Sequence, residues 1–165
     1  MTTSKNMTVF ASLLAVFLFI DSEIYSQGSS DIKNPKNSIQ LDLASLKFIG
    51  MCSINYERMM LQSPYYKLSI IAGFGGWYFT NISKWYYGYS FPISLNNILG
   101  SGNNHFETDL GLRYTILSNK SDKDKFQYFP ILNLGYRYQR PDGKGIIFRT
   151  FIGLSGLGIG IGKAF

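Results

Sequence analysis

The chain has 165 residues, of which 45% are hydrophobic, 16% aromatic and 16% charged, and its formal net charge is +6. This length allows one domain, and the apolar fraction is too low for a bundle of membrane-spanning helices. A single cysteine excludes an intrachain disulfide, and a single histidine beside it excludes zinc as a structural element. The basic residues are scattered, so we expect no nucleic-acid partner and assign the charge to contacts with anionic lipids.

Residues 1–26 are predicted to be a secretory signal peptide. Lys5 supplies positive charge, Val9 to Ile20 form an apolar run, and the polar stretch ending at Ser26 would hold the cleavage site. The run is shorter than the roughly 20 apolar residues that a membrane-spanning helix needs. A retained helical anchor or a buried helix are the alternatives. Residues 27–37 are polar and include Gly28, Ser29, Ser30, Asn34 and Pro35, which predicts a flexible lead-in.

From Ser38 onward, apolar and polar residues alternate along nearly every stretch, which is typical of β-strands. The boundary at Lys47 to Ile49 is the weakest, because residues 38–60 could also form one bent strand. Pro92 lies within a predicted strand, where its missing N–H weakens the ladder and favours a bulge or a bend. We expect eight strands, at Ser38 to Leu46, Gly50 to Met60, Tyr66 to Phe79, Trp85 to Leu99, Asn104 to Leu117, Tyr128 to Gln139, Gly145 to Leu154 and Leu157 to Phe165.

The last strand has bulky apolar residues on one face and almost no side chains on the other. The two faces are Leu157, Ile159, Ile161 and Phe165, and Gly158, Gly160, Gly162 and Ala164. This pattern suits the closing strand of a membrane β-barrel. Ile161 and the terminal Phe165 are predicted to form the signal that a barrel-assembly machinery reads.

The strand from Asn104 to Leu117 has one charged face and one apolar face. In a soluble secreted β-sandwich the charged face would point to water, whereas in a membrane barrel it would line the lumen. The signal peptide, the strand lengths and the aromatic strand ends favour the barrel. We therefore predict an all-β, eight-stranded, up-and-down antiparallel transmembrane barrel over residues 38–165, in the cell outer membrane of a Gram-negative bacterium.

Seven charged residues are predicted to face the lumen: Asp42, Glu57, Glu107, Asp109, Arg113, Arg137 and Arg149. Glu107, Arg137 and Arg149 are expected to form an Arg-Glu-Arg cluster, because intervening turns bring their strands together. We interpret it as structural, since charges in a narrow lumen must pair, with a gate or selectivity element as the alternative. An aromatic girdle at the membrane interface is predicted at Trp77, Tyr78, Trp85 and Tyr87.

Several segments carry a family resemblance: Ser53 to Arg58, Phe91 to Asn96 followed by Leu99 and Gly100, Asn104 to Glu107, and Gly135 to Gln139 with Pro141 to Gly143. Together they resemble a family of small outer-membrane β-barrel proteins common in Bacteroidota, over residues 38–165. The resemblance implies a signal peptide, a barrel and a terminal aromatic residue, without an assigned activity or catalytic residues. The chain departs from the family in its very short last outer connection, at Ser155 and Gly156.

No catalytic, cofactor or metal-binding motif stands out, so we expect no cofactor and no enzymatic activity. The low-ranked enzyme alternative is a lipid-modifying hydrolase with His105 and Glu107 as base and orienter and Ser90 or Ser94 as nucleophile. We predict a structural or surface-interaction role with a largely side-chain-filled lumen, and a narrow ion or small-solute pore as the alternative. The expected partners are outer-membrane lipids, including lipopolysaccharide, and the barrel-assembly machinery.

Overall fold

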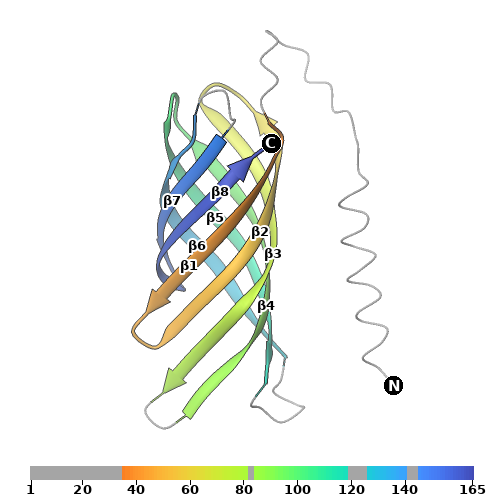
Figure 1. Ribbon diagram of the computed structural model, residues 1–165, viewed down its shortest axis with the longest axis vertical. Coiled ribbons are helices and arrows are strands. Elements are labelled where there is room, and N and C mark those ends of the chain that lie inside the picture. Colours follow the sequence, from red (N-terminus) through yellow and green to blue (C-terminus); the bar gives the residue numbers. More distant parts are fainter. Residues whose placement is uncertain (1–34, 82–83, 119–125, 141–144) are drawn as a thin grey trace, which may run out of the picture. The chain divides into compact units, whose positions relative to one another are not determined.

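The computed structural model describes residues 35–81, 84–118, 126–140 and 145–165. They form a closed antiparallel barrel, in which each strand pairs with the next and β8 pairs back with β1 (Figure 1). The strands are β1 (Asn37–Leu46), β2 (Ile49–Gln62), β3 (Tyr66–Asn81), β4 (Lys84–Leu99), β5 (Asn104–Leu117), β6 (Phe126–Tyr138), β7 (Gly145–Gly153) and β8 (Gly156–Ala164). The predicted all-β, eight-stranded fold is confirmed. The predicted signal peptide and residues 27–34 of the lead-in lie outside the described residues.

The strand boundaries follow the alternation in the sequence. Every predicted boundary lies within two residues of the observed one, and both predicted boundaries of the fifth strand are identical to those of β5. Residues 38–60 form two strands rather than one bent strand, because the chain turns at Lys47 and Phe48 and pairs Ser45 with Gly50. None of the described residues belongs to a helix that is long and apolar enough to cross a membrane.

Pro92 interrupts the pairing of β3 with β4 without changing its register. The pairs run to Ala72 and Ile93, stop, and resume at Gly75 and Ser90 in the same register. The weakened ladder is confirmed, and its cause is the N–H that proline lacks. The predicted bulge at Pro92 is wrong, since no residue is inserted there. The register shift of the barrel lies instead on β2, between Met59 and Leu61.

The interior of the barrel is mainly polar, with apolar side chains such as Ile71 and Phe151 among the polar ones, and its exterior is apolar. Along β1, Ser38, Gln40 and Asp42 are buried, whereas the intervening Ile39 and Leu41 are exposed. The other strands alternate in the same way, because successive side chains of a strand point to opposite faces. An eight-stranded barrel leaves a narrow interior, so inward-facing side chains from strands that are not neighbours can contact one another.

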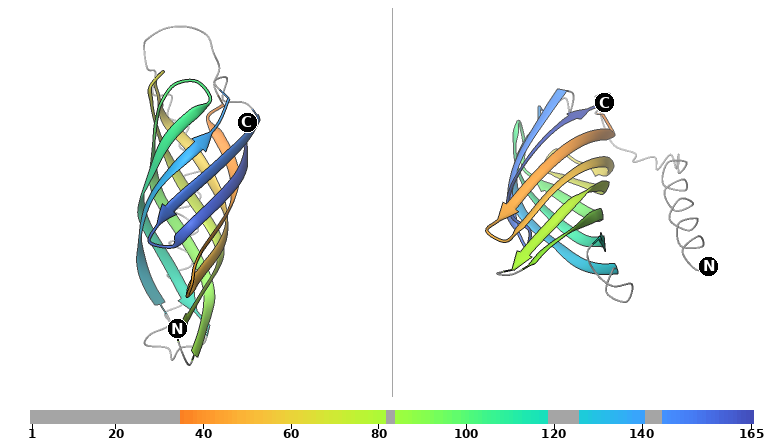
Figure 2. Two further views of the ribbon diagram at one scale, coloured as in Figure 1. Left: turned by 90° about the vertical axis from the view of Figure 1, so that its left-hand side faces the viewer. Right: turned by 60° about the horizontal axis from the view of Figure 1, so that its bottom comes forward.

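The two ends of the barrel differ. The start of β1 and the end of β8 lie at one end of the barrel, here called the terminal end, together with the strand ends where β2 meets β3, β4 meets β5 and β6 meets β7; the opposite strand ends lie at the far end (Figure 1). At the far end the β7–β8 hairpin, which turns at Leu154 and Ser155, stops well short of β6, which continues to Phe126 beyond its last pair with β7 (Figure 2). The wall of the barrel therefore extends less far toward the far end at this hairpin than it does at β6.

The inward glycines of β8 leave room for large side chains that cross the lumen. A Cβ added at Gly160 would collide with the Asp42 carboxylate and lie 2.6 Å from Arg149 Cγ. The Gly160→Val variant should therefore destabilise the barrel by about 1–3 kcal/mol, as overpacking does. The measurement is urea unfolding of the barrel folded in lipid vesicles. Gly76→Val is the matched control, because a Cβ at Gly76 meets open space, and an equal loss in both variants would contradict the packing argument.

Candidate functional site

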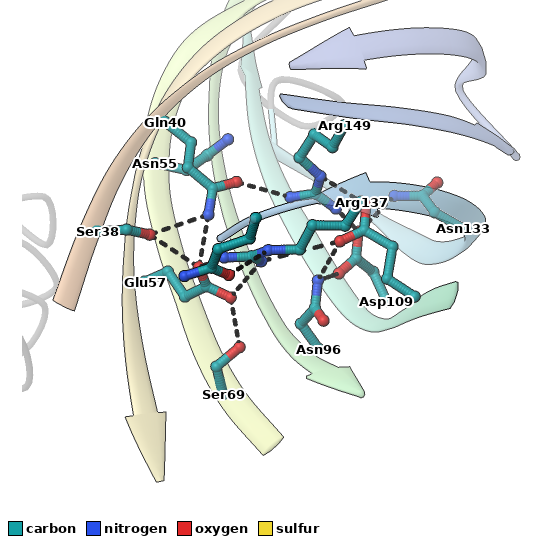
Figure 3. Close-up of polar contacts among 12 residues, drawn as sticks. Ser38, Gln40, Asn55, Glu57, Ser69, Asn96, Asp109, Asn133, Arg137 and Arg149 are labelled. Atoms are coloured by element: carbon teal, nitrogen blue, oxygen red, sulfur yellow. Dashed lines mark hydrogen bonds and ion pairs between the residues drawn. The ribbon is translucent and has the colours of Figure 1, made fainter. Parts of the chain in front are cut away.

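All seven of the charged residues proposed for the lumen are buried, each at most 6% exposed. They project inward from β1, β2, β5, β6 and β7, so the barrel brings together residues that are far apart in the sequence. Figure 3 shows Glu57, Asp109, Arg137 and Arg149 pointing toward one another. Six of the seven form one connected cluster, here called the charge cluster: Asp42, Glu57, Glu107, Asp109, Arg137 and Arg149. Arg113 is separate from it.

Glu57 is the most heavily bonded carboxylate of the charge cluster. Arg137 donates to both of its oxygens, from Nη1 at 2.9 Å and from Nη2 at 2.7 Å. Ser38 and Gln40 donate to Oε2 at 2.8 and 2.6 Å, and Ser69 donates to Oε1 at 2.6 Å. A paired guanidinium together with neutral donors is the arrangement that makes a buried carboxylate tolerable.

Arg149 joins the second half of the cluster. Its Nε donates to Glu107 at 2.7 Å, its Nη2 to Asp109 at 2.7 Å and its Nη1 to Gln40 at 3.0 Å. Arg137 Nη1 lies 3.9 Å from Glu107 Oε2, which links the two halves. The structure therefore contains the predicted Arg-Glu-Arg contact among Arg137, Glu107 and Arg149.

Buried amides complete the cluster, and the sequence analysis did not assign them to it. Asn55 donates to Asp42 at 2.8 Å, and Asn96 donates to Asp109 at 2.6 Å. Asn133 donates to the other oxygen of Asp109 at 3.3 Å. Their signal in the sequence is their place on the inward face of each strand. The amides matter because four carboxyl groups share only two guanidinium groups in the cluster and need further donors.

Arg113 lies nearer the far end and has a different environment. Its Nη1 donates to the Ser155 hydroxyl at 2.8 Å, across the lumen at the β7–β8 connection. Its Nε is buried without a hydrogen-bond partner. Among the described residues, no carboxylate forms an ion pair with it. A buried guanidinium without a counter-ion is costly.

The predicted aromatic girdle needs one correction. Tyr78, Trp85 and Tyr87 are exposed on the outside near the far end, but Trp77 is 7% exposed and lies inside the barrel. Its indole packs against the ring of Phe129, with centroids 5.1 Å apart. Trp77 and Tyr78 are consecutive in β3, so they must point to opposite faces, and the prediction overlooked this alternation.

The C-terminal residues that were proposed as an assembly signal lie on the outer face. Ile161 and Phe165 are both more than half exposed. The backbone of Phe165 exchanges hydrogen bonds with Asn37, donating to it at 2.9 Å and accepting from it at 3.3 Å. The last residue therefore helps to join the two ends of the barrel chain.

His105 does not form the arrangement that a hydrolase would need. Its side chain is buried and its Nδ1 has no hydrogen-bond partner, while Glu107 is engaged by Arg149 and Asn96. In the described part of the chain, no group of three or more His, Cys, Asp and Glu side chains is arranged to hold a metal ion. No protein-family model matches the sequence, and no curated protein matches it significantly.

Proposed function

We propose that this chain is a small outer-membrane β-barrel of a Gram-negative bacterium, of the kind common in Bacteroidota, with a structural or surface-interaction role. One observation carries the proposal: the polarity of the barrel is inverted relative to that of a soluble protein. Buried ion pairs lie inside the barrel, and large apolar side chains cover the outside of every strand. Monomeric soluble proteins rarely expose contiguous apolar patches larger than a few hundred Å².

The distribution of the exposed residues supports a membrane-facing belt. Aliphatic side chains occupy the middle of the outer surface, such as Leu110 on β5 and Leu132 on β6, which are paired in register. Tyrosines lie toward the strand ends, such as Tyr128 at the far end and Tyr138 at the terminal end. Aromatic residues at two levels with an aliphatic band between them are typical of transmembrane barrels.

The proposed partners follow from this surface. Outer-membrane lipids, including lipopolysaccharide at the outer leaflet, would surround the belt. The barrel-assembly machinery would act on β8, whose outer face presents Ile161 and Phe165. With the terminal end in the periplasm, the far end with its uneven rim would face the cell exterior, where a surface partner would bind.

The charge cluster argues against a pore. Glu57 and Arg137 are fully buried and bridge β2 and β6, which are not neighbours, so their contact crosses the lumen. We expect the purified barrel to show no steady conductance in planar lipid bilayers, because no water reaches these groups. Discrete, voltage-stable conductance steps would instead favour the narrow pore for ions or small solutes.

The geometry also gives little support to a lipid-modifying hydrolase. His105 is at the terminal end, next to the β4–β5 connection, whereas the candidate nucleophiles Ser94 and Ser90 pair with Gly111 and Thr115, farther along β5 toward the far end. We therefore propose a role without catalysis and without a cofactor. The catalytic alternative requires a loss of lipid modification in His105→Ala.

Heat-modifiability on a cold SDS gel tests the proposed location and fold together. The full chain should be found in the outer-membrane fraction and should migrate differently when boiled and unboiled, because closed membrane barrels resist SDS. Deletion of Phe165 should weaken the shifted band, since it removes the backbone contacts with Asn37 and the proposed assembly signal. A chain that is extracted by carbonate and shows no shift would favour the soluble secreted alternative.

A further inference from the structure

The far half of the lumen contains a cavity of about 800 Å³. Its lining residues come mainly from β8, β1, β2, β3 and β4, which are consecutive around the barrel. On four of these strands the lining is a run of three residues centred on an inward-facing one, so the cavity lies on the inside of the wall. The inward-facing residues are Gly158, Ala44, Met51, Trp77 and Gly88, and none of the lining residues is charged. The volume falls in the usual range of ligand pockets, about 300–1,000 Å³, and the lining is mainly apolar and aromatic, as in most of them.

The barrel wall has a notch beside this cavity. β6 pairs with β5 as far as Phe126, but it pairs with β7 only between Asn133 and Tyr138. The last backbone bond on this side is donated by Leu154 to Leu132 at 3.3 Å. Among the described residues, the remaining length of β6 has no partner strand on its β7 side. The notch therefore lies between this free edge of β6 and the ends of β8 and β1, beyond the β7–β8 hairpin toward the far end (Figure 2).

A proline on the edge of β6 keeps this edge open. Pro130 is two residues from Leu132, whose carbonyl faces β7, so the N–H that proline lacks would have pointed into the notch. Proline at such a position prevents further strand pairing. Tyr128, on the same edge, is exposed on the outside, and its ring packs against that of Tyr114 with centroids 5.1 Å apart. The notch therefore lies at the level of the aromatic residues near the far end.

A cationic group lies at the hairpin beside the notch. Arg113 reaches the hydroxyl of Ser155 in the β7–β8 connection, and its buried Nε has no partner. Leu157 and Gly158, which follow Ser155 closely in the chain, line the cavity. An anionic oxygen would satisfy this guanidinium by a charge-assisted hydrogen bond.

We propose that the cavity binds the acyl chain of an anionic amphiphile that enters from the membrane through the notch, with the anionic head on Arg113. The apolar lining takes the chain, the notch opens to the lipid at the aromatic level, and Arg113 supplies the charge at the entrance. This inference rests on the proposed membrane location. The head could be the carboxylate of a fatty acid or the phosphate of a phospholipid, which share this chemistry.

Quenching of Trp77 fluorescence by brominated lipids tests the proposal. The chain has two tryptophans, so the Trp85→Phe variant reports on Trp77 alone. The folded full-length variant is placed in phosphatidylcholine nanodiscs and titrated with dibromostearate, which should quench Trp77 saturably. Nanodiscs that contain dibrominated phosphatidylglycerol without fatty acid distinguish a phospholipid from a fatty acid as the source of the chain.

Two variants localise the binding. Ala44→Leu narrows the cavity and should abolish saturable quenching, whereas Ala72→Leu, on the outer face of β3, should leave it unchanged. Arg113→Gln should weaken dibromostearate binding by at least about tenfold, the loss expected for a charge-assisted hydrogen bond, and should not affect its methyl ester. If Ala44→Leu does not fold, the comparison of dibromostearate with its methyl ester in Arg113→Gln still tests the proposal.

The possible failures are distinguishable. Quenching that rises linearly with both brominated lipids, or that is the same in Ala44→Leu and Ala72→Leu, would overturn the proposed binding site while leaving the membrane barrel intact. A chain that does not insert into nanodiscs and shows no heat-modifiable band would overturn the proposed location, and the binding site with it.

Discussion

Replacing Glu57 by methionine should lower the free energy of unfolding of the barrel by about 3–5 kcal/mol, the usual cost of breaking a buried ion pair by removing one partner. Five hydrogen bonds converge on this carboxylate, from Arg137, Ser38, Gln40 and Ser69. The substitution removes all of them and leaves the Arg137 guanidinium buried without its main counter-ion. Urea titration of the barrel in lipid vesicles, followed by tryptophan fluorescence and by gel mobility, measures the change.

The double variant Glu57→Met/Arg137→Met separates the pair from its surroundings. A buried pair replaced on both sides by apolar residues is often close to neutral in stability. We therefore expect the double variant to be more stable than Glu57→Met alone, which is a favourable coupling in a double-mutant cycle. If the two single losses simply add, or if Glu57→Met costs less than about 1 kcal/mol, the charge cluster does not hold the barrel together.

Alternation accounts for most of what could be predicted from the sequence. A strand that places Glu107 and Asp109 on one face and Leu110 and Leu112 on the other reveals its boundaries and its two sides without knowledge of its neighbours. For the same reason the inward position of each cluster residue was predictable. The error at Trp77 arose from grouping aromatic residues by proximity in the sequence, although alternation alone would have placed this residue inside.

Contacts that depend on barrel closure could not be predicted in the same way. The two-pronged ion pair of the cluster joins Glu57 to Arg137, which lie on strands that are not neighbours, and their contact depends on the stagger of the closed sheet. The notch likewise depends on the register of β6 against β7, which ends at the pair of Asn133 and Gly153. Hairpin sequences indicate where strands turn, but they do not show how far each hairpin extends along the barrel.

Arginine in place of Leu110 should destabilise the inserted barrel by about 2–4 kcal/mol, the cost of a basic side chain at the middle of a bilayer. Leu110 is half exposed on the outside of β5 and lies midway between the outward-facing Phe106 and Tyr114. If these aromatic residues mark the two interfaces, the guanidinium would lie in hydrocarbon. The free energy of unfolding from lipid vesicles measures this effect.

Leu99→Arg is the matched control, because it separates depth in the membrane from loss of a leucine. Leu99 is similarly exposed, but it is the last residue of β4 and pairs with Phe106 at the terminal end. At an interface, arginine costs only about 0–1 kcal/mol. On a soluble barrel both positions would be in water, where most surface substitutions change stability by less than about 0.5 kcal/mol. A large loss at Leu110 with a small one at Leu99 therefore requires a hydrocarbon layer around the middle of the barrel, and equal small losses at both positions would remove the basis for a membrane location.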